Sequence, residues 1–159
     1  GIPDAILLKP GKLARDEMET LQCHSELGAI MLAGSSSPVL QMAAEIAMHH
    51  HERWDGAGYP AGLMGREIPE AARLVAIVDV YDALSHNRVY RKALPEASVL
   101  KTMADARSKH FDPRLLDLFL SLLPEMRTIA QAVPDEADET NGLWSPATDL
   151  ALRGRTGWS

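Results

Sequence analysis

The sequence contains a single cysteine, Cys23, among its 159 residues. One cysteine cannot form an internal disulfide, so cysteine usage is compatible with a reducing compartment, and we expect a cytoplasmic protein. Long apolar runs are also lacking, because the longest stretch without a charged residue, 27–44, is interrupted by glycine, serine and proline. We therefore expect no membrane span and no secretory signal peptide in this sequence.

The alternation of polar and apolar residues that is typical of strands is absent over any useful length, and no internal repeat is visible. Apolar residues recur instead at helical spacing, with proline or glycine near most helix ends. This pattern predicts an all-α fold, with helices over 15–33, 38–50 and 70–84, one that begins after Pro95, and one that starts at Asp112-Pro113. The proline- and glycine-containing segment 1–13 predicts an extended loop.

Acidic residues outnumber basic ones, which gives a formal net charge of −6. This charge argues against broad electrostatic binding of DNA, although a local arginine cluster could still bind a small phosphate-bearing ligand. From about residue 126 the sequence becomes acidic and then rich in small polar residues. We expect one domain over 1–124, and a tail over 125–159 that is partly disordered or docks on a neighbouring surface.

Histidine is the most informative residue type, because three of the six histidines are consecutive, at 49–51. Neighbours on a regular helix point about 100° apart, so His50 and His51 could share a metal only at a helix end, or could bind two adjacent metals. Antiparallel packing of the two preceding helices would let His24 approach them. Imidazole and carboxylate ligands suit iron, manganese or zinc better than magnesium or calcium.

One carboxylate, Asp79, lies in the middle of an otherwise apolar helix. A charge in such a place is costly unless a cation or several hydrogen bonds compensate it. Asp79 is therefore equally compatible with a structural ion pair and with a metal ligand. Asp82 follows three residues later on a similar face, and we interpret it as a hydrogen-bonding anchor behind the metal ligands.

An ordered string of motifs resembles one known family. The longest motif is the continuous stretch His50-His51-Glu52-Arg53-Trp54-Asp55-Gly56-Ala57-Gly58-Tyr59-Pro60. Shorter matching segments are Ile2-Pro3-Asp4, Lys9-Pro10-Gly11-Lys12-Leu13, Ala72-Arg73, Asp79-Val80-Tyr81-Asp82-Ala83-Leu84, Arg88-Val89-Tyr90-Arg91 and Phe111-Asp112-Pro113. Over about residues 1–124 they resemble the HD-GYP family, a branch of the HD superfamily of metal-dependent phosphohydrolases.

This resemblance implies a bundle of about five or more helices that binds two or three divalent metal ions, usually iron or manganese. The implied activity is hydrolysis of cyclic di-GMP to pGpG or GMP, as the output domain of a bacterial signalling protein such as a response regulator. The positions that correspond to metal ligands are His24, His50, His51 and Asp79. Those that correspond to phosphate-holding residues are Arg88 and Arg91, and the signature loop near the site contains Asp55, Gly58, Tyr59 and Pro60. The family is linked through this loop to protein partners.

The sequence departs from the family pattern in one respect. Family members carry a further histidine, and then a His-Asp pair followed by a lysine, before the segment that matches Gly1 onward, and this sequence contains none of them. We expect the intact protein to be the enzyme and residues 1–159 alone to be inactive; the alternative is a non-catalytic module that binds cyclic di-GMP or a protein. Without the helices that carry the pair, apolar faces at 15–33 and 38–50 would be uncovered, which favours a homodimer.

Overall fold

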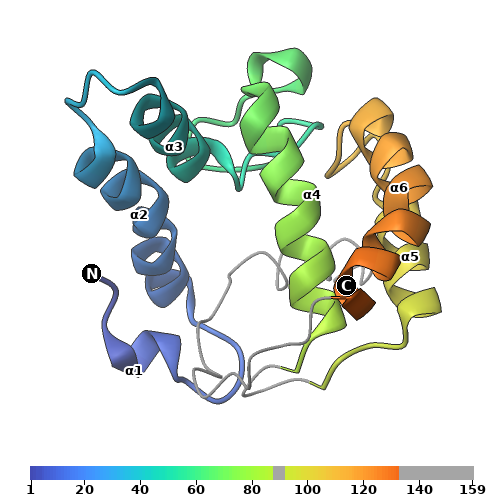
Figure 1. The fold of residues 1–159 in the computed structure, drawn as a ribbon. Helices are drawn as coiled ribbons and strands as arrows, with labels where there is room; N and C mark the ends of the chain where they lie inside the picture. Colours follow the sequence, from blue (N-terminus) through green and yellow to red (C-terminus); the bar gives the residue numbers. More distant parts are fainter. Residues whose placement is uncertain (88–91, 133–159) are drawn as a thin grey trace.

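The structure, a computed structural model, describes residues 1–87 and 92–132, and within these ranges its regular elements are helices, without a strand. The elements are α1 (Asp4–Leu7), α2 (Arg15–Leu32), α3 (Pro38–His49), the 3₁₀ turn η1 (Gly65–Glu67), α4 (Glu70–Ser85), α5 (Glu96–Asp105) and α6 (Pro113–Ala132). Figure 1 shows the α2–α3 pair on one side, α4 in the middle, and α5 with α6 on the other side. The all-α prediction is confirmed. None of the described helices combines the length and the hydropathy that crossing a bilayer requires.

The helix ends lie where local sequence features predict them. Gly34 follows α2 with a φ of 85°, the left-handed conformation that glycine adopts most readily. The Asp112 carboxylate caps α6 by accepting the backbone N–H groups of Arg114 at 2.9 Å and Leu115 at 3.3 Å. Ser37 differs from the expected cap, because its side chain makes no capping hydrogen bond. Pro38 at the first helical position starts α3 instead, since its φ is already helical and it has no N–H to satisfy.

Two observations at the ends of the chain modify the sequence predictions. The expected loop over 1–13 contains α1, whose turn forms because the Pro3 carbonyl accepts the N–H groups of Ile6 at 2.9 Å and Leu7 at 3.2 Å. At the other end, α6 continues to Ala132, past the domain boundary expected at residue 124. Residues 133–159, most of the predicted tail, lie outside the described residues.

The hydrophobic core lies between α4, α5 and α6. Its buried side chains are Ile77, Val80, Leu84, Val99, Met103, Phe111, Leu115, Leu116, Phe119 and Leu123. Full burial of one such side chain stabilises the fold by roughly 1.5–3 kcal/mol. Most of the apolar burial is therefore in this half of the molecule.

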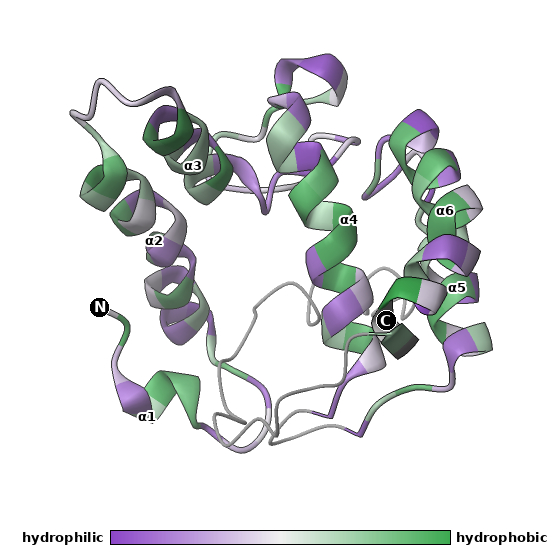
Figure 2. Ribbon diagram, in the orientation of Figure 1, coloured by the Kyte–Doolittle hydropathy of each residue, from purple (hydrophilic) through white to green (hydrophobic). Residues whose placement is uncertain are grey.

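The α2–α3 pair contributes little to that core. Only Leu21 and Ser25 are buried in α2, and α3 has no buried residue. Ile30, Met31 and Val39 are 69%, 85% and 74% exposed, and Figure 2 shows hydrophobic residues along α3 and the adjacent end of α2. The position of this pair relative to the core therefore depends on the contact of α3 with α4 and on the loop that follows α3.

The turn between α5 and α6 contains a buried histidine, His110, that is 7% exposed. Burial and the adjacent Arg53 guanidinium lower the pKa of His110 from 6.5 to about 4, and the Asp55 carboxylate only partly offsets them. Between these two pH values the unfolded chain binds a proton at His110 that the folded chain does not. The stabilising contribution is thus complete above pH 6.5 and is lost as the pH falls towards 4.

We expect acid to destabilise the wild-type protein more than His110→Phe, because phenylalanine cannot be protonated. The extra loss in the free energy of unfolding between about pH 7.5 and about pH 5 should be about 2 kcal/mol. Urea unfolding curves at both pH values measure this difference. Equal pH dependence in the two proteins would contradict the burial of a neutral His110.

Candidate metal centre

Three histidines meet at the open side of the α2–α3 pair. His24 lies on α2, His50 caps the C-terminal end of α3, and His51 follows it. The Nε2 atoms of His24 and His50 are 3.3 Å apart, and those of His24 and His51 are 3.0 Å apart. One ring nitrogen of each histidine lies within 4.8 Å of the other two. The structure thus brings together three of the four ligands that the resemblance implies.

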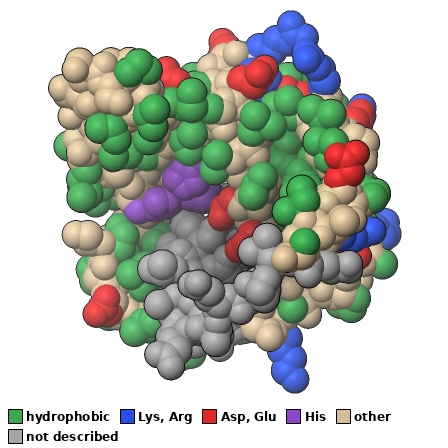
Figure 3. All heavy atoms as spheres, viewed as in Figure 1, with side chains coloured by type: hydrophobic (Ala, Val, Ile, Leu, Met, Phe, Trp, Pro, Cys, Tyr) green, Lys and Arg blue, Asp and Glu red, His purple; other side chains and the backbone are tan. Residues whose placement is uncertain are grey.

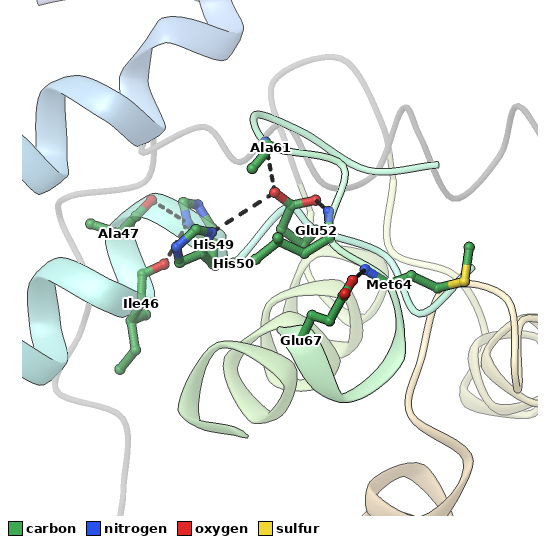
Figure 4. Close-up of polar contacts among 9 residues, drawn as sticks. Ile46, Ala47, His49, His50, Glu52, Ala61, Met64 and Glu67 are labelled. Carbon is green, nitrogen blue, oxygen red and sulfur yellow. Dashed lines mark hydrogen bonds and ion pairs between the residues drawn. The ribbon is translucent and has the colours of Figure 1, made fainter. Parts of the chain in front are cut away.

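Backbone carbonyls determine which ring nitrogen faces the cluster. Nδ1 of His24 lies 2.8 Å from the Leu21 oxygen, and Nδ1 of His50 lies 3.0 Å and 2.9 Å from the oxygens of Ile46 and Ala47 (Figure 4). Because a carbonyl oxygen only accepts, each Nδ1 carries the hydrogen and each Nε2 presents a lone pair. Two lone pairs that face each other repel unless a cation lies between them.

This donor set fits a divalent transition metal. Burial, together with the neighbouring His50 and His24, lowers the pKa of His51 to about 2. Burial also lowers the pKa of His24, although the Leu21 carbonyl and the Asp79 charge act in the opposite direction. Neutral imidazole is the form that binds metal ions, and it suits iron, zinc and copper. His24 and His51 are therefore in their ligating form at neutral pH.

His50 and His51 lie at a helix end, which is the arrangement under which the sequence allows them to share one site. Their ring centroids are 3.9 Å apart and the ring planes are inclined by 42°. His49, the last residue of α3, does not join them. Its Nδ1 faces the Glu52 carboxylate instead, 3.8 Å away (Figure 4).

Asp79 lies on α4 beside the cluster. Its charge acts to raise the pKa values of both His24 and Tyr59, so its carboxylate is close to these two side chains. It is nevertheless outside the group of ligand atoms within 4.8 Å of one another, which among the described residues comprises the three histidines. Asp82 pairs with His86 at 3.0 Å, and its side chain is 51% exposed. Its expected role behind the metal ligands stays a prediction.

The signature loop folds back onto His51. The Tyr59 N–H donates to the His51 carbonyl at 3.3 Å, and the phenol ring stacks on the imidazole with centroids 4.8 Å apart. Tyr59 is buried, and its hydroxyl has no hydrogen-bond partner within the described ranges. Burial and, to a smaller extent, the Asp79 charge raise the pKa of this phenol, so it remains a donor. An unpaired buried donor beside the cluster fits a ligand oxygen at this place.

Glu52, for which the sequence predicts no separate role, holds the loop in place. Its side chain is fully buried, and its two carboxylate oxygens accept the N–H groups of Ala61 at 2.8 Å (Figure 4) and of Leu63 at 3.0 Å. Every residue except proline has a backbone N–H group, so the sequence does not indicate which of these groups Glu52 would bind. The one available signal is the position of Glu52 directly after the histidines in the longest motif.

The other predicted site residues lie in different places. Asp55 binds the Arg53 guanidinium through both carboxylate oxygens, at 3.0 Å and 2.7 Å, and also accepts the Ala57 N–H at 3.1 Å. It therefore closes the first turn of the signature loop. Arg88 and Arg91 lie outside the described residues. Figure 3 shows histidine side chains at the surface below the hydrophobic side chains of α2 and α3, with acidic side chains beside them.

Comparisons with known proteins match the chain to one family and to relatives with similar names. A family model described as "HD domain" matches residues 1–115. The chain is 46% identical over 142 residues to the "Probable cyclic di-GMP phosphodiesterase" of Vibrio cholerae, a match that covers 86% of this chain and 32% of that protein. It is 41% identical over 134 residues to the 3'3'-cGAMP-specific phosphodiesterase 2 of the same organism, with 84% and 26% covered.

A solved structure shares the fold. A cyclic GMP-AMP-specific phosphodiesterase of Vibrio cholerae superposes with a TM-score of 0.57 at 18% sequence identity, over 89% of this chain and 29% of that chain. The present chain thus spans 26–32% of the length of the two relatives described above.

At Gly58 the signature loop packs closely against the backbone of residues 51–53. A Cβ atom here would lie 2.6 Å from both the His51 oxygen and the Glu52 Cα, and would also clash with the Arg53 nitrogen. We expect Gly58→Ala to displace this backbone, to destabilise the protein by about 1–3 kcal/mol and to weaken manganese binding by about tenfold. Thermal unfolding and calorimetric titration with Mn²⁺ measure the two effects.

The matched control is Ala57→Ser at the exposed neighbouring position, which should behave like the wild type. Wild-type stability and Mn²⁺ affinity in Gly58→Ala would show that the loop is not closely packed against residues 51–53.

Proposed function

The chain belongs to the HD domain family, in its HD-GYP branch, and on that premise we propose that the protein containing it is a metal-dependent phosphodiesterase that hydrolyses cyclic di-GMP. The observation that carries this proposal is the convergence of one ring nitrogen each of His24, His50 and His51 on one point. Such a centre suits phosphodiester hydrolysis, because a bound divalent metal acidifies water and neutralises charge on the phosphoryl oxygens.

We assign the three histidines and Asp79 as the residues that hold the metal, with iron or manganese as the proposed ion. The protein contributes orientation: carbonyls of α2 and α3 turn Nε2 of His24 and His50 towards the centre, which also raises the basicity of the rings. The Tyr59 hydroxyl supplies a hydrogen-bond donor for a phosphate or water oxygen next to His51. Two or three metals in the intact domain remain part of the proposal.

The proposed substrate is cyclic di-GMP, the substrate in the name of one relative, and 3'3'-cGAMP is the alternative because a second relative is named as specific for it. Arg88 and Arg91 are proposed to hold the phosphates, because the guanidinium fork matches two phosphate oxygens. The sequence alone supports this assignment.

Several finer assignments are proposals on narrower grounds. The exposed residues Ile30, Met31 and Val39 support association into a homodimer. The family resemblance is the ground for proposing signalling partners that contact the loop 58–60 and a place in a response regulator. The cysteine usage is the ground for proposing a cytoplasmic location.

The histidine assignment is tested with the full-length protein. Replacing both His50 and His51 with alanine should remove bound transition metal and abolish hydrolysis, because two of the three nitrogen ligands are lost. Elemental analysis gives the metal content, and product analysis with cyclic di-GMP and 3'3'-cGAMP gives turnover and selectivity. His49→Ala is the control, because this adjacent histidine lies outside the cluster and should leave the metal content unchanged.

Unchanged metal stoichiometry in the double variant would refute the assignment. A wild-type protein that binds metal and cyclic di-GMP without hydrolysing either nucleotide would instead support the non-catalytic binding module.

The arginine assignment predicts a different result. Neutralising Arg88 and Arg91 by substitution with glutamine should weaken cyclic di-GMP binding and leave the metal content intact. A hydrogen bond to a charged group is worth roughly 1.5–3 kcal/mol, so we expect a loss of about tenfold or more per arginine. Calorimetry measures the affinity, with Arg107→Gln as a control because Arg107 forms an exposed ion pair with Asp117. Equal affinity in the doubly substituted protein would exclude the proposed contact.

A further inference from the structure

Backbone hydrogen bonds join the turn between α5 and α6 to the segment that follows His51. The Trp54 N–H donates to the His110 carbonyl at 3.1 Å, and the Asp55 N–H donates to the Lys109 carbonyl at 2.8 Å. Two backbone hydrogen bonds therefore join residues 54–55 to residues 109–110, close to His51 in the sequence.

A side-chain contact extends this connection by one residue towards the cluster. Nη1 of Arg53 lies 3.2 Å from Nδ1 of His110. A guanidinium only donates, so the His110 Nδ1 is the acceptor and its ring hydrogen is on Nε2. Asp55 holds the guanidinium through Nε and Nη2, at 3.0 Å and 2.7 Å, which fixes the direction in which Nη1 points.

The α5–α6 turn is in turn anchored to the hydrophobic core. Phe111 is 2% exposed and belongs to the core cluster. Asp112 accepts a hydrogen bond from Nη1 of Arg73 on α4 at 2.5 Å, and both side chains are largely buried. Arg73 also donates from Nε to the Ile68 carbonyl at 2.9 Å. The place of His110 is therefore set by the packing of α4, α5 and α6.

These contacts connect two parts of the site that lie on different halves of the molecule. The histidines belong to the α2–α3 pair and its end, which bury little apolar surface, whereas Asp79 lies on α4, beside the core. We propose that His110 is a positioning residue, which accepts the Arg53 hydrogen bond and so holds the turn at 50–51 in register with α4. The histidine cluster and Asp79 can then act on one metal centre. The involvement of Asp79 rests on the proposed function, whereas the Arg53–His110 contact does not.

Two substitutions at 110 separate the hydrogen bond from the packing. Phenylalanine keeps an aromatic ring against Phe111, whose centroid lies 4.5 Å from that of His110, but it offers no acceptor. Asparagine offers an amide oxygen near the position of Nδ1. In the full-length, metal-free protein we expect His110→Phe to bind Mn²⁺ about tenfold more weakly than the wild type, a loss typical of residues that orient metal ligands. His110→Asn should bind close to the wild-type level.

Arg107→Gln is the matched control, because it breaks an exposed ion pair of the same turn, at 2.7 Å from Asp117, without touching the contact. Calorimetry gives the Mn²⁺ affinity, and the visible absorption of the Co²⁺-loaded protein reports ligand geometry independently of turnover. Wild-type affinity in His110→Phe, or equal losses in the Phe and Asn variants, would overturn the proposal.

A second variant keeps the test decisive if His110→Phe does not fold. Arg53→Met removes the donor from the opposite side of the contact, together with the ion pair to Asp55. An affinity for Mn²⁺ about tenfold weaker than that of Asp55→Asn, which loses the ion pair but keeps the Arg53 donor, would support the positioning role, whereas wild-type affinity would overturn it. The affinity measurement also distinguishes failure of the positioning proposal from failure of the proposed phosphodiesterase function. A wild-type protein that binds Mn²⁺ but hydrolyses no cyclic dinucleotide contradicts the phosphodiesterase and leaves the comparison of the variants intact.

Discussion

The Nε2 lone pairs of His24 and His50 face each other across 3.3 Å, and the arrangement of the site depends on this contact. Each ring is held by a hydrogen bond from Nδ1 to a carbonyl one turn earlier in its own helix, so neither ring can turn away without losing that bond. A cation between the two nitrogens removes the repulsion. The site is thus arranged so that a bound cation would stabilise the two facing ring nitrogens.

Apolar packing and directional hydrogen bonds stabilise different parts of the structure. Apolar burial is concentrated between α4, α5 and α6, where it sets how the helices pack. Around the histidines the chain is held by hydrogen bonds to buried charges, as at Glu52 with Ala61 and Leu63. The hydrophobic effect has no direction, so it cannot orient an imidazole ring, whereas hydrogen bonds depend on direction. The candidate metal ligands and their loop therefore depend on polar contacts, and the partners on the turn between α5 and α6 are placed by the core.

Local signals in the sequence were sufficient for the five longer helices, α2 to α6, and for the family, but not for the short helix α1. Pro38, Pro113 and Gly34 mark helix ends through conformations that each residue adopts by itself, and the apolar spacing between them has a helical period. The motif that begins at His50 identifies the family because a long ordered string does not arise by chance. Four residues of that family pattern were predicted as ligands, and the three histidines among them converge.

Only the tertiary structure decided which side chains meet. His24 contacts His50 across 26 residues of sequence, and His110 contacts Arg53 across 57. Neither Glu52 nor His110 could be assigned a role beforehand, because their partners are backbone amides and a side chain on a distant turn. Conformational preferences act over a few residues, whereas these contacts require whole helices to be packed in place. The sequence by itself therefore determined the five longer helices and the set of candidate ligands. The contacts of α2 with α3, of α3 with α4, and of residues 53–55 with the turn between α5 and α6 decided which of those ligands come together, because they join segments that are far apart in the sequence.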